Sequence, residues 1–340
     1  MSSVLVTGGA GYIGSHTCVE LINNGYEVIV FDNLSNSSQR SLNRVKAITK
    51  KDITFFEGDI THQDDLNHVF SKYKISYVIH FAGLKAVSES VEDPLTYYDN
   101  NVSGTLCLLK TMKKYNVKKL VFSSSATVYG EPESLPLTEV MPSGIIKNPY
   151  GRSKLIIENM LNDLCSSDPN WSIIALRYFN PVGAHPSGLI GENPKGKPNN
   201  IMPLISQVAT GNRDFLEVMG SDYETHDGTG VRDYIHVVDL SCGHIKALKK
   251  IREINTFSIV NLGTGHGYSV LDLVREFERA SGKKIPIKIV DRRKGDIAAC
   301  YADCTFANSY LNWKACHGLA EMCLDTWRWL EANPMGFDEA

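Results

Sequence analysis

Short apolar runs rich in β-branched residues alternate with helical patterns along the first half of the chain. This alternation predicts a parallel sheet whose strands are joined by right-handed helical crossovers. The predicted strands are Ser3–Thr7, Glu27–Phe31, Ile53–Glu57, Tyr77–His80, Lys119–Ser123 and Ser172–Leu176. The predicted helices cover residues 12–24, 63–73 and 94–115, and a further helix begins at residue 149. The predicted fold class is therefore α/β, with a doubly wound parallel sheet.

The pattern changes beyond Pro181. Stretches rich in glycine and proline at residues 183–203, and short mixed segments after them, replace the regular alternation. We predict a first domain at residues 1–180 and a smaller mixed α/β domain at residues 181–340. Some chain is expected to return to the first domain around residues 231–244. Residues 319–330 have helical spacing and are predicted to pack against the rest.

A glycine-rich turn separates the first predicted strand from the first predicted helix. Its sequence, GGAGYIG at residues 8–14, contains the G-x-G-x-x-G spacing of dinucleotide-binding turns. Glycine permits close approach of the backbone to a pyrophosphate, whose charge the helix N-terminus attracts. Asp32 closes the second strand, where a carboxylate binds a ribose 2'-hydroxyl and repels a 2'-phosphate. The sequence therefore predicts NAD, rather than NADP, as the cofactor.

Tyr150 and Lys154 stand four residues apart at the start of a helix that Asn148 is expected to cap. This spacing places both side chains on one face, and Ile157 and Leu161 continue that face into the core. A free phenol, with a pKa of about 10, is too weak a base at neutral pH, but a nearby ammonium favours the phenolate. We therefore predict that the pair forms an acid–base site, with an oxidised nicotinamide as a second positive charge.

Other polar residues follow the ends of predicted strands, where open α/β sheets bind ligands. Ser125 is either a turn former or a hydrogen-bonding partner of a substrate hydroxyl beside Tyr150. Asp59 is either a turn aspartate or a contact of the adenine region. Lys85 follows the small-residue turn at residues 81–83 and is a candidate cofactor contact. Arg232, in the second half, is a candidate anion ligand because its guanidinium donates in a fork.

Composition narrows the function classes further. The chain has 340 residues, 43% of them hydrophobic, and a formal net charge of -3, which excludes a nucleic-acid or anionic-membrane footprint. No apolar run approaches the length of a membrane span, and the N-terminus lacks a signal-peptide pattern, so a cytoplasmic location is expected. None of the eight cysteines has common zinc-motif spacing, so reduced thiols and no metal are expected.

Eight motifs, in the same order along the chain, resemble the extended short-chain dehydrogenase/reductase family, and within it the 4-epimerases of UDP-sugars. The first four are TGGAGYIGSH at 7–16, DNLSNS at 32–37, HFAGLKAVSES at 80–90 and SSSATVYG at 123–130. The others are NPYGRSK at 148–154, RYFNPVGAHPSG at 177–188, GTGVRDYIHV at 228–237 and RRKGD at 292–296. The later motifs are the more specific to the epimerases.

The resemblance implies a Rossmann-type domain that holds NAD, a C-terminal domain that holds a UDP-sugar, and a homodimer formed through helices that include residues 94–115. It implies that Tyr150 takes the proton of the sugar 4-hydroxyl, that Lys154 lowers the pKa of Tyr150 and binds the nicotinamide ribose, and that Ser125 assists. The hydride of C4 passes to NAD, the 4-keto sugar turns over, and the hydride returns to its other face.

Most ligand contacts are also assigned by the resemblance alone. The implied cofactor contacts are Gly8, Gly11, Tyr12, Ile13, Gly14, Asp32, Asn33, Leu34, Ser35, Asn36, Ser37, Asp59, Ile60, Phe81, Ala82, Gly83, Leu84, Lys85, Asn100, Ser125, Tyr150, Lys154 and Phe179. The implied substrate contacts are Lys85, Ser125, Tyr150, Asn180, Asn200, Ile201, Arg232, Arg293, Lys294, Gly295, Asp296 and Cys300.

Cys300 departs from part of the family. Epimerases limited to glucose and galactose carry a tyrosine at this position, whereas those that also accept N-acetylated sugars carry a small residue. A small residue leaves room for an acetamido group, so UDP-N-acetylhexosamines are predicted as additional substrates. Alternatively, Cys300 is a small core residue and another group, such as Tyr301, closes the pocket.

Three other functions are compatible with parts of the pattern: an epimerase restricted to UDP-glucose and UDP-galactose, a nucleotide-sugar 4,6-dehydratase, and a dinucleotide sensor without catalysis. The dehydratase is disfavoured because no carboxylate follows Ser125 in Ala126-Thr127-Val128, and the sensor because Tyr150 and Lys154 are both present. The sequence leaves open the preferred sugar pair. It also leaves open whether the pathway is galactose catabolism or the supply of surface polysaccharide.

Overall fold

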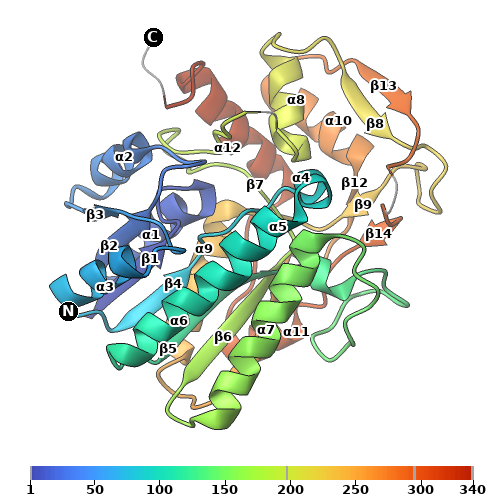
Figure 1. The fold of residues 1–340 in the computed structure, drawn as a ribbon. Coiled ribbons are helices and arrows are strands. Elements are labelled where there is room, and N and C mark those ends of the chain that lie inside the picture. Colours follow the sequence, from blue (N-terminus) through green and yellow to red (C-terminus); the bar gives the residue numbers. More distant parts are fainter. Residues whose placement is uncertain (1, 197, 294–295, 338–340) are drawn as a thin grey trace.

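A seven-stranded parallel sheet forms the centre of the molecule in the computed structural model, which describes residues 2–196, 198–293 and 296–337 (Figure 1). In spatial order its strands are β11, β6, β5, β4, β1, β2 and β3. Their bounds are β1 Ser3–Thr7, β2 Glu27–Asp32, β3 Thr54–Glu57, β4 Tyr77–His80, β5 Lys119–Ser125, β6 Ser172–Tyr178 and β11 Phe257–Leu262. The predicted doubly wound parallel sheet is confirmed.

Helices cover both faces of this sheet and form two separate cores with it. Val4 and Val6 of β1 face one core, while Leu5, between them, faces the other, as the two-residue period of a strand requires. The first core includes side chains of α1 Tyr12–Asn23, α2 Gln39–Thr49 and α9 Val237–Lys250. The second includes side chains of α3 Gln63–Lys72, α6 Gly104–Lys114 and α7 Pro149–Ser167.

The helix predicted at residues 94–115 is divided by a π-helical segment. It consists of α5 Pro94–Tyr97, the π-helical η1 Tyr98–Ser103 and α6 Gly104–Lys114. Two short elements precede and follow this region, α4 Val87–Glu92 and the 3₁₀ helix η2 Ala126–Tyr129. Figure 1 shows α5 and α6 end to end, with α7 beside them across one face of the sheet.

The second half of the chain builds a smaller mixed unit with its own core, which includes Val218, Phe277 and Met322. Its strands pair as β7 with β10, β8 with β13, and β12 with β9 and β14. Their bounds are β7 Asn180–Val182, β8 Leu216–Met219, β9 Val231–Arg232, β10 Tyr234–His236, β12 Tyr268–Ser269, β13 Ile287–Val290 and β14 Ala299–Cys300. The helices of this unit are α8 Ile201–Ala209, α10 Val270–Ser281 and α12 Leu319–Ala332, whereas α11 Thr305–Leu311 packs against β11 and α9 in the first core.

The chain returns from the second half to the first sheet through α9 and β11. α9 packs against α1, and β11 pairs with β6 along six residues, from Phe257 opposite Ile173 to Leu262 opposite Tyr178. The returning segment reaches further along the chain than the expected residues 231–244. Because β11 belongs to the large sheet, a division at residue 180 stays a prediction about domain organisation.

Candidate active site

The predicted cofactor residues cluster at the carboxyl edge of the parallel sheet. Gly8 follows β1, Asp32 ends β2, Asp59 follows β3, Phe81 follows β4 and Ser125 ends β5. The strand order reverses at β1, which lies between β2 and β4. Ligands of doubly wound sheets bind at such a reversal, because the loops of neighbouring strands leave it in opposite directions.

The glycine turn after β1 has the geometry of a phosphate cradle. Gly8 has a φ of 70°, and a Cβ there would lie 2.7 Å from the backbone nitrogen of Ala82. A Cβ at Gly14 would overlap the carbonyl oxygen of Gly8, so the turn and the start of α1 pack together only without side chains. Gly11 caps α1 without a side-chain hydrogen bond, which leaves the positive end of the helix to backbone N–H groups. These features fit the pyrophosphate of a dinucleotide.

Asp32 joins the glycine turn to the loop after β2. Its buried carboxylate accepts from the backbone nitrogens of Ala10, at 3.0 Å, and Leu34, at 2.9 Å, and from the hydroxyl of Ser37, at 2.8 Å. A carboxylate has about four lone-pair positions, so one remains for a ribose hydroxyl. Leu34 has a φ of 57°, which bends the loop at residues 33–37 around this carboxylate.

Asp59 pairs with the neighbouring cofactor loop. Its carboxylate accepts from the Asn33 side chain at 2.7 Å and from the backbone and hydroxyl of Thr61 at 2.8 and 2.6 Å. Burial acts to raise the pKa of Asp59, but these hydrogen bonds outweigh it and lower the pKa below its usual value. Ile60, beside it, is buried. The structure thus holds Asp59 in place beside the loop at residues 33–37.

Asn101, the neighbour of the predicted cofactor contact Asn100, organises the loop after β4. Its side chain accepts from the backbone nitrogen of Leu84 at 2.8 Å and donates to the Leu84 carbonyl at 3.0 Å and to Ser153 at 3.1 Å. Asn100 lies in the same π-helical segment and is half-buried, so its assignment as a cofactor contact stays a prediction. The sequence carried no signal for this role, because the π-helical turn changes which residues face the loop.

Tyr150 and Ser125 meet between the first turn of α7 and the end of β5. The side chain of Asn148 accepts from the Gly151 backbone nitrogen at 2.7 Å, so it caps α7 as predicted. Burial raises the pKa of the Tyr150 phenol, and the hydrogen bond with Ser125 acts in the opposite direction. Burial is the larger of the two influences, and the lowering of this pKa expected from Lys154 together with an oxidised nicotinamide stays a prediction.

Lys154 is buried and points to the end of β5. Its ammonium donates to the Ser123 carbonyl at 2.8 Å and lies 5.9 Å from the centroid of the Tyr150 ring. Burial lowers the pKa of Lys154 to about 8, and the Glu158 carboxylate acts in the opposite direction. In the described part of the chain, the Ser123 carbonyl is the backbone acceptor of this ammonium. A second donor position of the ammonium is therefore available for a hydrogen bond to a ribose hydroxyl.

The predicted substrate residues lie on the second unit and on the segments that join it to the sheet. Asn180 begins β7, Asn200 and Ile201 begin α8, and Arg232 lies in β9. Lys294 and Gly295 lie outside the described residues. Their neighbours Arg293 and Asp296 are paired, with Arg293 Nε 3.0 Å from the Asp296 carboxylate.

Cys300 lies in β14, directly opposite Arg232 of β9. Its side chain is 9% exposed and belongs to an apolar cluster with Val128 and Phe179, which places it against the segment that follows Ser125. Successive side chains of a strand point to opposite faces. Tyr301 accordingly faces the Val231 and Gly267 side, where a Cβ built at Gly267 would lie 3.2 Å from the Tyr301 ring.

Glu192 connects two predicted ligand contacts and was missed by sequence reasoning. Its carboxylate lies 3.2 Å from the Lys85 ammonium and accepts from the Asn200 amide at 2.9 Å. Lys195, three residues on, donates to the Leu34 carbonyl at 2.7 Å. The segment that carries both residues therefore spans the cofactor edge, and its glycine- and proline-rich sequence gave no sign of those contacts.

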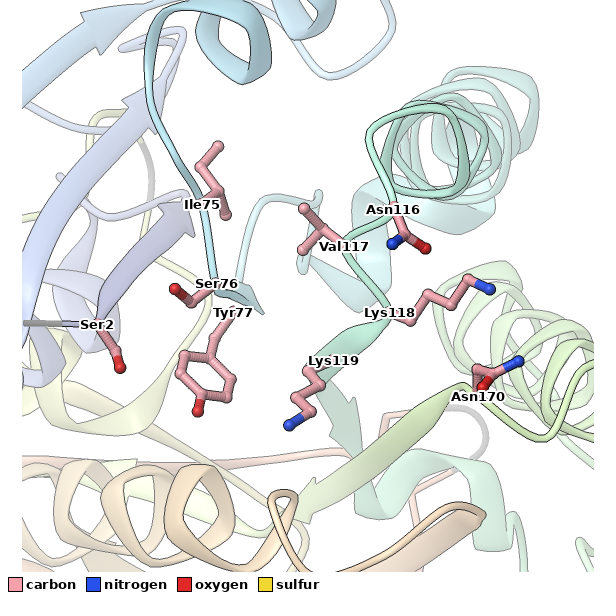
Figure 2. Close-up of a pocket in the computed structure, with 9 residues that line it drawn as sticks. All are labelled: Ser2, Ile75, Ser76, Tyr77, Asn116, Val117, Lys118, Lys119 and Asn170. Carbon is pink, nitrogen blue, oxygen red and sulfur yellow. The ribbon is translucent and has the colours of Figure 1, made fainter.

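Features elsewhere in the described chain stand apart from this cluster. The hollow in Figure 2 is lined by Lys118, Lys119 and Tyr77 among others, and contains none of the predicted site residues. Within the described ranges, the group close enough to hold a metal ion is His226, Asp227 and Asp272, separate from the cysteines. No helix in those ranges is long and apolar enough to cross a membrane.

Comparisons with known proteins identify relatives over the whole length. The model of the NAD dependent epimerase/dehydratase family matches residues 4–263. The chain is 59% identical to the UDP-glucose 4-epimerase of Bacillus subtilis over 99% of both chains, and 58% identical to the human protein of the same name over 98% of both.

Solved structures of similar proteins have the same fold over nearly the whole chain. The UDP-glucose 4-epimerase from Bifidobacterium longum, in complex with NAD+ and UDP, superposes with a TM-score of 0.96 at 53% identity, covering 98% of this chain and 100% of that one. The UDP-Glc/GlcNAc 4-epimerase from Campylobacter jejuni superposes with a TM-score of 0.85 at 35% identity, covering 98% of this chain and 100% of that one.

Proposed function

This chain belongs to the NAD dependent epimerase/dehydratase family, and we propose that it interconverts UDP-GlcNAc and UDP-GalNAc in addition to UDP-glucose and UDP-galactose. Its activity on the second pair, the NAD-dependent 4-epimerisation of UDP-glucose, makes it an isomerase. The observation that carries the proposed extension to N-acetylated sugars is the small, buried Cys300 beside Arg232.

The proposed chemistry assigns one task to each residue of the Tyr150 cluster. Tyr150 accepts the proton of the sugar 4-hydroxyl and returns it, Ser125 hydrogen-bonds the same hydroxyl, and Lys154 provides positive charge beside both. NAD, when bound, supplies the acceptance and return of a hydride at C4 of the sugar. Because burial opposes the charged form of Tyr150, positive charge at this site has a large effect on the phenol.

The argument for N-acetylated sugars is one of volume. The 4-keto sugar must turn over within the site, so its C2 substituent needs room in both orientations. Cys300 contacts the apolar wall that contains Val128 and Phe179, next to the end of β5 that carries Ser125. A tyrosine there would fill the space that an acetamido group needs, and overfilling a packed site costs about 1–3 kcal/mol, or roughly a five- to hundred-fold loss of binding. Tyr301, which directly follows β14, lies beside Gly267 and outside the apolar cluster of Cys300, and this supports the argument of volume.

Cys300→Tyr tests the proposal when wild type and variant are assayed on both pairs of UDP-sugars. We expect activity on UDP-GlcNAc to fall about five- to hundred-fold while activity on UDP-galactose largely survives. Cys316→Tyr, at an exposed cysteine, is the matched control and should keep both activities. Wild-type protein without activity on UDP-GlcNAc, or a variant that loses both activities equally, contradicts the proposal.

A homodimer through the helices on one face of the sheet is also proposed. Val91 of α4, Leu95 of α5 and Leu106 of α6 are 60%, 78% and 41% exposed, and Ile156 of the adjacent α7 is 39% exposed. Apolar side chains gathered on neighbouring helices are typical of an interface, and a second copy of the chain would cover them.

The proposed location is the cytoplasm. All eight cysteines are free thiols, and burial raises the pKa of several of them, including Cys165 to about 11 and Cys242 to about 12. Unpaired cysteines in this number are typical of a reducing compartment.

A further inference from the structure

The face of α7 that carries Tyr150 and Lys154 continues one turn further to Glu158. Residues at i, i+4 and i+8 of a helix lie one above the other. Glu158 is 2% exposed and Lys154 is 5% exposed, so a carboxylate and an ammonium are buried together behind the phenol. Burial of a carboxylate without partners would cost several kcal/mol, so its partners decide what it does.

Arg177 of β6 and Ser124 of β5 hold the Glu158 carboxylate. Arg177 forms a two-pronged ion pair, with Nε 3.0 Å from Oε1 and Nη2 2.6 Å from Oε2. The Ser124 hydroxyl donates to Oε1, and the Arg177 guanidinium stacks on the Tyr129 ring at 4.6 Å. Because Arg177 bonds both carboxylate oxygens and Ser124 bonds one of them, the carboxylate has a single defined position.

Three consecutive serines of β5 match the three groups on α7. The Ser123 carbonyl accepts from Lys154, the Ser124 hydroxyl donates to Glu158, and Ser125 is hydrogen-bonded with Tyr150. One strand end therefore sets the positions of all three side chains relative to each other. A shift of α7 by one turn would break all three contacts at once.

The charged and titratable groups around Lys154 come from four elements. On α7 they are Tyr150 and Glu158. On β4, His80 is held between Thr7 and Thr105, and burial followed by the Lys154 charge lowers the pKa of His80 to about 3, so it is neutral. On β6, Arg177 is paired with Glu158, and Tyr178 is held neutral because burial raises its pKa. β5 contributes the backbone carbonyl of Ser123, which accepts from the ammonium, and the uncharged Phe122 ring, whose centroid lies 4.9 Å from it. Among the described residues, Glu158 is therefore the anion whose charge acts on Lys154.

We propose that Glu158 is a positioning residue for Lys154: Arg177 and Ser124 hold its carboxylate one helical turn from the ammonium, and its charge keeps that ammonium protonated while the sugar reacts. The inference rests on the proposed role of Lys154 in the epimerase reaction. It adds a residue that touches neither cofactor nor sugar.

Two opposing influences on the pKa of Lys154 predict how a change at Glu158 shifts the pH dependence of the rate. Burial lowers the pKa of Lys154 to about 8, and Glu158 raises it. In Glu158→Gln the anion is gone and the Arg177 cation is uncompensated, so both changes lower the pKa of Lys154 further. The ammonium is then lost at a lower pH, and the loss of rate at alkaline pH should begin about one pH unit earlier.

The experiment measures Lys154 directly in the holoenzyme. Protein labelled with ¹³C at the lysine side chains is titrated by NMR, and Lys154→Met identifies the Lys154 signal. The same samples are assayed for reduction of the bound cofactor by UDP-galactose between about pH 6 and pH 10. In Glu158→Gln we expect both the Lys154 titration and the alkaline limb of the rate to move down by about one pH unit, with rates near pH 6 much less affected.

Two variants serve as controls for charge and for geometry. Asp163→Asn removes a carboxylate from the exposed side of the same helix and should leave the titration unmoved. Glu158→Asp keeps the charge and should restore the wild-type pH values even where the rate is lower. If Glu158→Gln does not fold, Glu158→Gln combined with Arg177→Met leaves no unpaired charge, and the Lys154 titration should still move down.

A Lys154 titration that stays at the wild-type pH in Glu158→Gln, or in the double variant, overturns the inference. A titration that moves while the alkaline limb of the rate stays in place overturns its catalytic half, because the reaction then does not depend on the ammonium. Wild-type protein that interconverts no UDP-sugar in the same assay marks the failure of the proposed function instead.

Discussion

At the scale of single residues, burial pushes the two reactive groups toward their neutral forms. It raises the pKa of Tyr150 and lowers that of Lys154 to about 8. In a site of low polarity a small change in nearby charge therefore has a large effect on both groups. Ser125 acts against burial at Tyr150, as Glu158 does at Lys154, so each reactive group has one partner that favours its working form.

Tyr150→Phe keeps the ring and removes the proposed base. General acid–base groups contribute about 100- to 10,000-fold, so we expect reduction of the bound cofactor by UDP-galactose to slow by at least that range. NAD content and the thermal unfolding temperature should stay near wild type. Tyr310→Phe, which loses a hydroxyl 2.9 Å from Ser258 on the far strand β11, is the control and should keep the rate. A Tyr150→Phe rate above about a tenth of wild type would identify another base.

At the scale of elements, the site depends on how strand ends meet helix starts. The β1 turn and α1 pack without side chains at Gly8 and Gly14, and the end of β5 meets α7 through three consecutive serines. At the glycine turn, backbone atoms approach so closely that one added carbon atom would displace the start of α1, whereas β5 and α7 are joined by hydrogen bonds of the α7 side chains. The cofactor edge is therefore less tolerant of substitution than its exposed position suggests.

Gly14→Ala should damage the cofactor site more than the fold. The added Cβ would overlap the Gly8 carbonyl oxygen and lie 2.7 Å from the Gly9 Cα, so the turn must open. We expect a loss of about 1–3 kcal/mol in the free energy of unfolding and the loss of most NAD from the purified protein. Denaturation in urea and assay of the released nucleotide measure the two effects. Gly318→Ala is the control: an added Cβ there has no described atom within 4 Å beyond its chain neighbours, so the free energy of unfolding and the NAD content should change little. Full retention of NAD by Gly14→Ala would contradict the predicted role of the glycine turn.

At the scale of the whole molecule, residues distant in the chain meet beside the candidate site. Glu192 contacts Lys85, and Lys195 contacts Leu34, so the segment after β7 reaches both sides of the cofactor edge. α9 and β11 bring the second half back onto the first sheet, which makes the two units one structure. Exposed apolar side chains lie on α4, α5 and α6: Val91, Leu95 and Leu106.

Leu95→Glu tests whether those helices form the interface of a dimer. A charge in place of a side chain that is 78% exposed should leave the fold intact but oppose burial against a second copy. We expect wild type to sediment as a dimer and the variant to shift toward monomer at micromolar concentration. Ile289→Glu, at an exposed apolar position of β13, should stay dimeric. A wild-type monomer, or a Leu95→Glu dimer as stable as wild type, would show that the interface lies elsewhere.

The sequence by itself determined the features that depend on short spacings. β1 and β4 have the predicted bounds, α1 begins at Tyr12, and Asn148 caps α7. These features follow from residues within a few positions of each other, where propensity, capping and side-chain period act directly. The cofactor could be predicted for the same reason, because the glycine turn and Asp32 belong to one strand–helix–strand unit.

Only the tertiary structure decided which distant residues serve the site. The edge strand β11 joins β6, Asn101 holds the loop after β4 through Leu84, and Arg177 holds Glu158 from another element. Such contacts depend on how strands are ordered and how helices rotate as they pack, which the local pattern of polar and apolar residues does not specify. The tertiary structure also decided the pKa of Tyr150. The sequence shows the spacing between Tyr150 and Lys154, but the folded protein sets how deeply the phenol is buried.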